Sequence, residues 1–229
     1  MLIKGLQKLT LLDFPGRTAC TVFTAGCNFR CPFCHNAVLV TGNDGDYYDE
    51  DEIFDFLKKR KNVLDGVAVT GGEPLLQHDI ERFLYEIKDM GYAVKLDTNG
   101  SFPEKLEGIL QLGLADYVAM DVKNHFEKYA VTVGVENFDV GAVKKSMEIL
   151  KNSGVEYEFR TTVTENFHTL DDIEKLAKEI SGTEHYFLQN FEDSGNLIDE
   201  NCRGVSRDKM REMLETVKKY VPNAGLRGM

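Results

Sequence analysis

The sequence contains no tryptophan, only five prolines and no apolar run longer than a strand. A transmembrane helix needs about 18 or more consecutive apolar residues, so we predict no membrane span. The first 17 residues, MLIKGLQKLTLLDFPGR, also lack the continuous apolar run and the small-residue cleavage site of a secretory signal. These absences predict a cytoplasmic protein.

Basic residues are scarce relative to acidic ones. The chain has 27 Lys and Arg residues against 38 Asp and Glu residues, which gives a formal net charge of -11. An excess of negative charge disfavours attraction to nucleic acid and to anionic lipid. We therefore expect neither nucleic acid nor a membrane as a partner.

Alternating apolar patterns predict the fold. Short β-branched or aromatic runs alternate with segments whose apolar residues recur at helical spacing, which indicates βα units. The runs are nearly continuously apolar, as expected for strands buried on both faces. The six predicted strands are Ala19 to Thr24, Gly66 to Thr70, Tyr92 to Thr98, Tyr117 to Lys123, Tyr157 to Val163 and His185 to Phe191.

Helical spacing is clearest in three segments, which contain Ile80, Phe83, Leu84 and Ile87, then Leu170, Ile173, Leu176, Ala177 and Ile180, and finally Met210, Met213, Leu214 and Val217. Ser206 is the predicted N-cap of the last helix. Since the common closed barrel needs eight βα units, we predict an α/β fold with a partial, open (β/α)6 TIM-like barrel over residues 19–221. Residues 1–18 are predicted to form an N-terminal hairpin extension, and residues 1–229 a single domain.

Three of the five cysteines lie within eight residues, in the segment GCNFRCPFCHN directly after the first predicted strand. Cys27, Cys31 and Cys34 form a CxxxCxxC pattern, which suits metal binding better than disulfide formation. Structural zinc usually has four protein ligands, whereas three thiolates on a 4Fe-4S cluster leave one iron open to a substrate. A zinc site completed by His35 and an electron-carrying cluster with a distant fourth ligand remain alternatives. Cys20 and Cys202 are interpreted as structural, and a role for Cys202 as a hydrogen donor is the alternative.

This loop, with Phe33 before its last cysteine, resembles the cluster motif of the radical S-adenosylmethionine (SAM) superfamily. The resemblance implies a 4Fe-4S cluster on the three cysteines, with Phe33 beside SAM. The second predicted strand ends in Gly71, Gly72, Glu73 and Pro74, similar to the GGEP motif whose backbone binds the SAM amino group. Glycines allow close approach of the backbone, and proline fixes the following turn.

The next two strands end in motifs that resemble those of glycyl-radical-enzyme activating proteins, namely Asp97-Thr98-Asn99-Gly100 and Asp121-Val122-Lys123. The resemblance implies that Asp97, Thr98 and Asp121 hold a monovalent cation, Na+ or K+, beside the SAM carboxylate. It also places Asp97, Asn99 and Lys123 in the cofactor site. A structural ion pair between Asp97 and Lys123 is the alternative.

Two further residues are assigned to the cofactor site by the same resemblance. Arg160 on the fifth strand matches an arginine near the ligand, although an ion pair with Glu158 is the alternative. Asn190 on the sixth strand replaces a histidine of the pyruvate formate-lyase activating enzymes. Asparagine can supply the hydrogen bond but cannot titrate.

The resemblance covers essentially the whole chain and points to activating proteins of anaerobic ribonucleoside-triphosphate reductases. It implies reductive cleavage of SAM to a 5′-deoxyadenosyl radical, which removes hydrogen from a glycine of a partner glycyl radical enzyme. Anaerobic ribonucleotide reductase is the expected partner, and a flavodoxin or ferredoxin the expected electron donor. The alternatives are an activase of the pyruvate formate-lyase type, a small-molecule enzyme such as 7-carboxy-7-deazaguanine synthase, and a non-enzymatic electron carrier.

Overall fold

One eight-stranded sheet organises the protein, and the computed structural model describes residues 1–41, 46–193 and 195–228. The strands follow one another in chain order across the sheet. Their bounds are β1 (Ile3–Thr10), β2 (Ala19–Thr24), β3 (Gly66–Gly71), β4 (Ala93–Thr98), β5 (Tyr117–Asp121), β6 (Glu156–Val163), β7 (Tyr186–Asn190) and β8 (Gly225–Arg227). The first pair is antiparallel and every later pair is parallel.

The six predicted strands are confirmed as β2 to β7, with ends that shift by at most two residues. The predicted N-terminal hairpin is also present, because β1 pairs antiparallel with β2. The prediction missed β8, which pairs with β7 through Phe187, Leu188 and Gln189. The last repeating unit therefore carries a strand after its helix.

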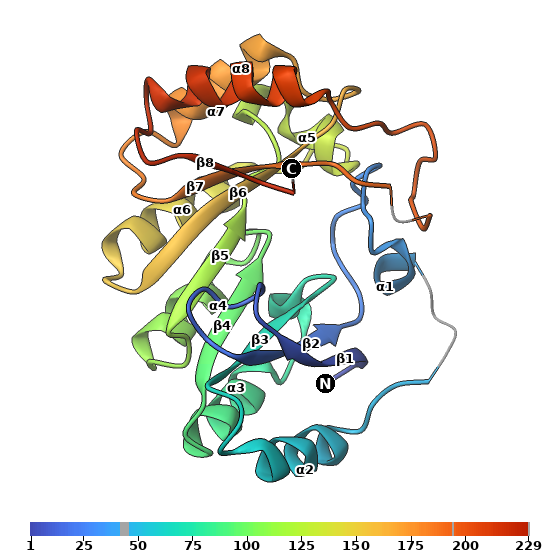
Figure 1. The fold of residues 1–229 in the computed structure, drawn as a ribbon, viewed down its shortest axis with the longest axis vertical. Helices are drawn as coiled ribbons and strands as arrows, with labels where there is room; N and C mark the ends of the chain where they lie inside the picture. Colours follow the sequence, from blue (N-terminus) through green and yellow to red (C-terminus); the bar gives the residue numbers. More distant parts are fainter. Residues whose placement is uncertain (42–45, 194, 229) are drawn as a thin grey trace.

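Helices connect the parallel strands and cover the outside of the sheet (Figure 1). They are α1 (Ala37–Thr41), α2 (Glu50–Arg60), α3 (Ile80–Asp89), α4 (Pro103–Gln111), α5 (Tyr129–Val133), α6 (Gly141–Asn152), α7 (Leu170–Glu179) and α8 (Arg207–Lys218). Short 3-10 turns occupy Pro74–Leu76 and Phe126–Lys128. Within the described ranges, no helix combines the length and apolarity that a membrane span requires.

The predicted helical faces follow the hydrophobic pattern. In α3, all four of the predicted apolar residues are buried. In α7 the prediction holds except for Leu170, which starts the helix and is partly exposed. Ser206 caps α8, since its side chain accepts a hydrogen bond from the Lys209 amide.

The sheet curves around a central space but does not close (Figure 1). Its edges are β1 on one side and the short β8 on the other. Because the parallel strands run in one direction, the loops after their carboxyl ends gather at one rim, where ligands bind in such folds. That rim carries the three-cysteine loop and the motif turns.

Candidate active site

The three-cysteine loop leaves the end of β2 and faces a cavity. Cys27, Cys31 and Cys34 are free thiols, and all three line the same cavity. Burial raises the pKa of Cys27 to about 11 and that of Cys31 to about 12. A metal that binds here must therefore displace protons from these thiols.

The end of helix α5 holds the cysteine loop in place. The Arg30 amide donates a hydrogen bond to the Val133 carbonyl over 2.8 Å, at the end of α5. Gly134 follows with φ of 65°, and a Cβ there would lie 2.3 Å from the Arg30 carbonyl oxygen. A glycine is required at this position both by the backbone conformation and by the close contact.

The turn after β3 packs directly against the cysteine loop. The Gly72 amide donates to the Thr24 carbonyl over 2.9 Å, and the Glu73 amide donates to the Gly26 carbonyl over 2.8 Å. A Cβ on Gly72 would lie 1.9 Å from the Gly26 oxygen. Gly71 and Gly72 were predicted to let the backbone approach a ligand closely. In the structure, the turn that they form also packs against the cysteine loop.

Glu73 is a buried carboxylate that links two motif turns. Its Oε1 accepts from the Leu75 amide over 3.0 Å and from the Thr98 hydroxyl over 2.9 Å, and its Oε2 accepts from the Asn99 amide over 2.7 Å. Burial raises the pKa of Glu73 to about 7, against the lowering effect of these hydrogen bonds. The Glu73 side chain is fully buried.

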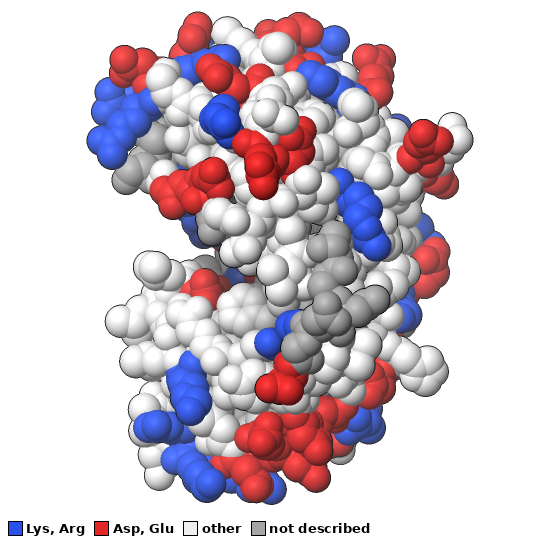
Figure 2. All heavy atoms as spheres, turned by 90° about the vertical axis from the view of Figure 1, so that its right-hand side faces the viewer, with Lys and Arg blue, Asp and Glu red and all other residues white. Residues whose placement is uncertain are grey.

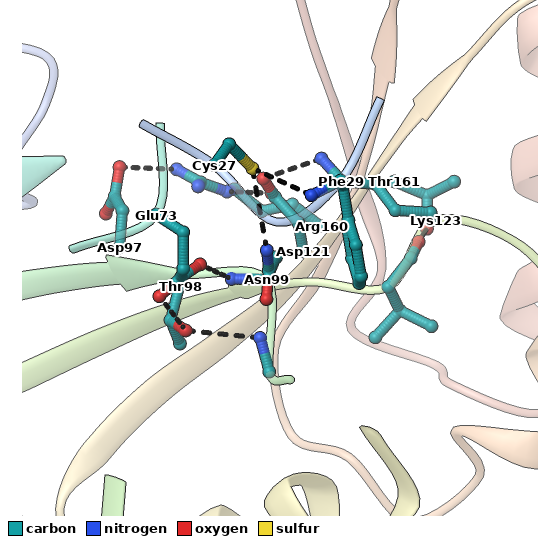
Figure 3. A network of polar contacts seen from close by, with 12 residues as sticks. Cys27, Phe29, Glu73, Asp97, Thr98, Asn99, Asp121, Lys123, Arg160 and Thr161 are labelled. Atoms are coloured by element: carbon teal, nitrogen blue, oxygen red, sulfur yellow. Dashed lines mark hydrogen bonds and ion pairs between the residues drawn. The ribbon is translucent and has the colours of Figure 1, made fainter. Parts of the chain in front are cut away.

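Asn99 lies between Cys27 and Glu73 (Figure 3). Its Nδ2 donates to Sγ of Cys27 over 3.8 Å and to Oδ1 of Asn28 over 2.9 Å. The Phe29 amide also donates to Sγ of Cys27, over 3.3 Å. Hydrogen bonds to a cysteine sulfur stabilise negative charge on it, as required of a metal-bound thiolate.

Charged side chains from β4, from the end of β5 and from β6 form an ion-pair array (Figure 3). Nε of Arg160 lies 3.0 Å from Asp121, and its Nη1 lies 3.4 Å from Asp97. Nζ of Lys123 lies 3.0 Å from Asp121, and Lys95 pairs closely with Asp97. The array brings together four residues that the motifs predicted and adds Lys95.

The electrostatics of the array favour ionised side chains throughout. Burial alone would raise the pKa of Asp97, but Arg160 and Lys95 together hold it below its usual range. Burial alone would also raise the pKa of Asp121, but Arg160 and Lys123 hold it below its usual range. The pKa values of Lys123 and Arg160 are raised despite burial, because Asp121 lies beside both.

The two alternative ion pairs considered from the sequence are not formed. Asp97 pairs with Lys95 and Arg160 rather than with Lys123. Glu158 is fully buried, and it accepts a hydrogen bond from the Tyr117 hydroxyl over 2.7 Å and one from Nη2 of Arg227, also over 2.7 Å. Arg227 belongs to β8, so this pair ties the unpredicted strand to the barrel interior.

His168 supports the end of β5 and was missed by sequence reasoning. Its Nε2 lies 2.8 Å from the Lys123 carbonyl oxygen, and its Nδ1 accepts from the Thr164 amide over 3.1 Å. Its ring packs edge-on against Phe33, with centroids 6.1 Å apart. Burial lowers the pKa of His168 to about 4, so it is a neutral ring that donates to Lys123.

Asn190 does not line the cavity. Its side chain exchanges two hydrogen bonds with the Val205 backbone, of 3.0 and 3.1 Å, and so anchors the segment before α8. The neighbouring Gln189 lines the cavity instead. Successive residues of a strand point to opposite faces, so Gln189 and not Asn190 is the polar side chain of this strand end that lines the cavity.

The cavity has a volume of about 700 Å³, within the range of small-molecule sites. Its wall includes the three cysteines, the turn of Gly71 to Pro74 and the ion-pair array. Both sheet edges contribute, since Leu11 and Leu12 after β1 and Arg227 of β8 also line it. Figure 2 shows the surface hollowed between the upper and lower parts of the molecule.

In the described part of the chain, no three His, Cys, Asp or Glu side chains, the three cysteines included, are already grouped to hold a single metal ion. The fold and the site together define an open α/β barrel enzyme with a three-cysteine loop at its ligand cavity. The chain belongs to the radical SAM superfamily, whose family model matches residues 21–180. Membership of this family implies a 4Fe-4S cluster and SAM.

Two relatives align with nearly the whole chain. A protein of Methanocaldococcus jannaschii named "Putative glycyl-radical enzyme activating enzyme" is 35% identical, over 99% of this chain and 95% of its own length. The 7-carboxy-7-deazaguanine synthase of the same organism is 28% identical, over 90% of this chain and 86% of its own length.

Solved structures agree on the fold. SuiB of Streptococcus suis bound to SAM superposes with a TM-score of 0.71 at 16% identity, over 90% of this chain and 49% of SuiB, so the chain spans about half of that protein. A domain of pyruvate-formate lyase-activating enzyme from Bacteroides vulgatus gives a TM-score of 0.58 at 17% identity, over 71% of this chain and 99% of that domain.

Proposed function

We propose that this enzyme is an activase that uses SAM to remove a hydrogen atom from a glycine of a partner glycyl radical enzyme. The observation that carries the proposal is the shared cavity, which both the three cysteines and the ion-pair array line. The near full-length similarity to a relative named as a glycyl-radical enzyme activating enzyme supports the same reaction.

Cys27, Cys31 and Cys34 hold the cluster in this proposal. The residues fit it because all three thiols are free, share one cavity and leave room beside them for a ligand. When bound and reduced, the cluster supplies the electron that cleaves SAM into methionine and a 5′-deoxyadenosyl radical. The hydrogen bonds from Asn99 and Phe29 to Cys27 stabilise charge on that sulfur.

The cofactor site is proposed to combine the turn of Gly71, Gly72, Glu73 and Pro74 with Phe33, Asp97, Asn99, Lys123 and Arg160. Lys123 and Arg160 offer cationic donors to a carboxylate, and Arg160 also fixes both aspartates. We replace Asn190 by Gln189 as the contact from β7, because Gln189 lines the cavity. We leave a monovalent cation out, since Asp97 and Asp121 already have three cationic partners.

The proposed substrate is a polypeptide loop that enters through the open side of the barrel. Leu11 and Leu12 stand at the cavity wall with 70% and 90% of their surface exposed. Exposed leucines beside a cavity suit contact with another protein. Anaerobic ribonucleotide reductase is the proposed partner on the strength of the sequence resemblance, and a pyruvate formate-lyase type of enzyme is the alternative.

A cytoplasmic location and a flavodoxin or ferredoxin as electron donor complete the proposal. Its support is that all five cysteines are free, as a reducing compartment would keep them. The similarity to 7-carboxy-7-deazaguanine synthase favours a second candidate, in which the cavity takes a small molecule. The two candidates differ in whether SAM cleavage responds to a protein or to a small substrate.

The test is anaerobic reconstitution of the cluster, reduction by dithionite, addition of SAM and quantification of 5′-deoxyadenosine and methionine by mass spectrometry. Replacement of Cys27, Cys31 or Cys34 by alanine should abolish the cluster and both products. Cys202→Ala is the matched control, because Cys202 does not line the cavity, and it should retain both. A glycyl radical signal in electron paramagnetic resonance after addition of candidate partners would identify the substrate, and a cluster-loaded protein that yields neither product would refute the proposal.

A further inference from the structure

Lys95 places an ammonium group inside the barrel. It lies two residues before Asp97 on β4, so both side chains point to the same face of the strand. Lys95 is only 2% exposed, and its Nζ pairs closely with the Asp97 carboxylate. A buried ammonium is stable only when it is paired, so this contact is a fixed part of the site.

Both aspartates of the array already have cationic partners. Asp97 and Asp121 carry two negative charges, whereas Lys95, Lys123 and Arg160 carry three positive ones. A metal cation at these oxygens would therefore be repelled by the three cationic side chains that already pair with them. In a buried setting, such repulsion is weakly screened.

The third oxygen expected to bind a cation is engaged elsewhere. The Thr98 hydroxyl donates to Oε1 of Glu73 over 2.9 Å and accepts from the Gly100 amide over 3.1 Å. The Thr98 hydroxyl is therefore already engaged in the hydrogen bonds that join the two motif turns. Na+ and K+ are hard cations that prefer oxygen ligands, and Lys95 and Arg160 already occupy oxygens of Asp97.

We infer that the ammonium of Lys95 takes the place of a monovalent metal cation at Asp97, so that this protein binds SAM without Na+ or K+. The inference rests on the proposed binding of SAM in this cavity. Lys95 is a positioning residue in this scheme. It holds Asp97 in place, and Asp97 in turn holds Arg160.

The test measures SAM binding to the cluster-loaded protein by anaerobic equilibrium dialysis. Three buffers of equal ionic strength contain K+, Na+ or tetramethylammonium, which is too bulky to fit between carboxylates, as the only monovalent cation. The wild type should bind SAM with the same dissociation constant, within about twofold, in all three. Lys95→Met should bind at least tenfold more weakly in tetramethylammonium and should recover in K+ or Na+.

Lys59→Met is the matched control, because Lys59 is exposed on the outer helix α2, and it should behave as the wild type does. Weakened binding by the wild type in tetramethylammonium would overturn the inference, and this comparison needs no variant to fold. Lys95→Met binding that is independent of the cation would overturn it as well. Absence of SAM binding by the wild type in every buffer would overturn the proposed function and the inference with it.

Discussion

Asn99 donates a hydrogen bond from its side-chain amide to Sγ of Cys27 over 3.8 Å, across 72 residues of sequence. The same residue donates its backbone amide to Glu73. Asn99 therefore links the cysteine loop to the two motif turns. The resemblance implied a place for Asn99 in the cofactor site, and the structure adds a contact of its side chain with a cysteine sulfur.

We predict that Asn99→Leu lowers the reduction potential of the cluster. A hydrogen bond to a ligand sulfur stabilises the additional negative charge of the reduced state. Its loss should shift the midpoint by about 60 mV, which is a tenfold change in a one-electron equilibrium. Asn99→Asp, which also adds negative charge, should lower the potential further in a redox titration followed by electron paramagnetic resonance.

Ser101→Ala is the control for this prediction. Ser101 bonds to the side chains of Asn99 and Asn28 but does not contact Cys27, so its removal leaves the bond to sulfur in place. Its potential should stay close to that of the wild type. Equal potentials in all three variants would mean that Asn99 does not tune the cluster.

Gly72→Ala should dislodge the cysteine loop. The added Cβ would meet the Gly26 carbonyl oxygen at 1.9 Å, and both groups belong to backbones that are hydrogen-bonded to each other. We expect a loss of about 3 kcal/mol in the free energy of unfolding, at the upper end for overpacking, together with reduced iron content. Urea denaturation and iron analysis measure the two effects.

Gly108→Ala supplies the contrast. Gly108 lies within α4, and its added Cβ would come no closer than 3.7 Å to another group, the Glu81 carboxylate. An alanine there should stabilise the helix by up to about 1 kcal/mol. Similar destabilisation of both variants would show that the close approach at Gly72 is relieved at little cost.

His168 should make stability depend on pH between about 6.5 and 4. Its pKa falls to about 4 in the folded protein because of burial. In that interval the unfolded chain binds a proton that the folded protein excludes, so stability falls as pH falls. The shift corresponds to roughly 3 kcal/mol between pH 7 and pH 4.

The matched variant is His168→Gln, which keeps a donor for the Lys123 carbonyl but cannot titrate. Urea unfolding at pH 5 and pH 7 should show a smaller loss of stability for the variant than for the wild type. Equal losses in the two proteins would assign the pH dependence to other groups.

Arg227→Leu should destabilise the protein by about 3 kcal/mol, because it leaves the buried carboxylate of Glu158 without its charged partner. Adding Glu158→Gln should restore part of that loss in denaturant unfolding. Arg211→Leu, which breaks an exposed pair with Asp208, should cost less than about 1 kcal/mol. If the two arginine variants are equally stable, the pairing of β8 with the barrel interior is unimportant.

The parallel strands were predictable because burial on both faces imposes a long apolar run. Val67, Ala68 and Val69 of β3 illustrate this, as all three are buried. The three residues of β8 are only partly buried and form no apolar run. Their strand conformation depends on pairing with β7, which is 35 or more residues away along the chain. The local sequence pattern therefore does not predict β8.

The motifs located the cavity, but not the way in which its charges pair. Lys95 stands within an apolar strand, where a lysine usually indicates a solvent-facing position. Here the strand faces a polar barrel interior, so the lysine is buried beside Asp97. Whether Gln189 or Asn190 reaches the cavity depends on which face of β7 points into the barrel. An alternation of polar and apolar residues cannot identify that face, because both faces of the strand are covered.

The hydrogen bonds from Gly72 to Thr24, from Glu73 to Gly26 and from Asn99 to Glu73 join three loops that are far apart in sequence. None of these amides can be exposed to solvent without loosening the loop that accepts its bond. We therefore expect the three loops to form one cooperative unit of local unfolding. Amide hydrogen exchange should report a single opening free energy for them, and ligand binding at any one loop should slow exchange in all three.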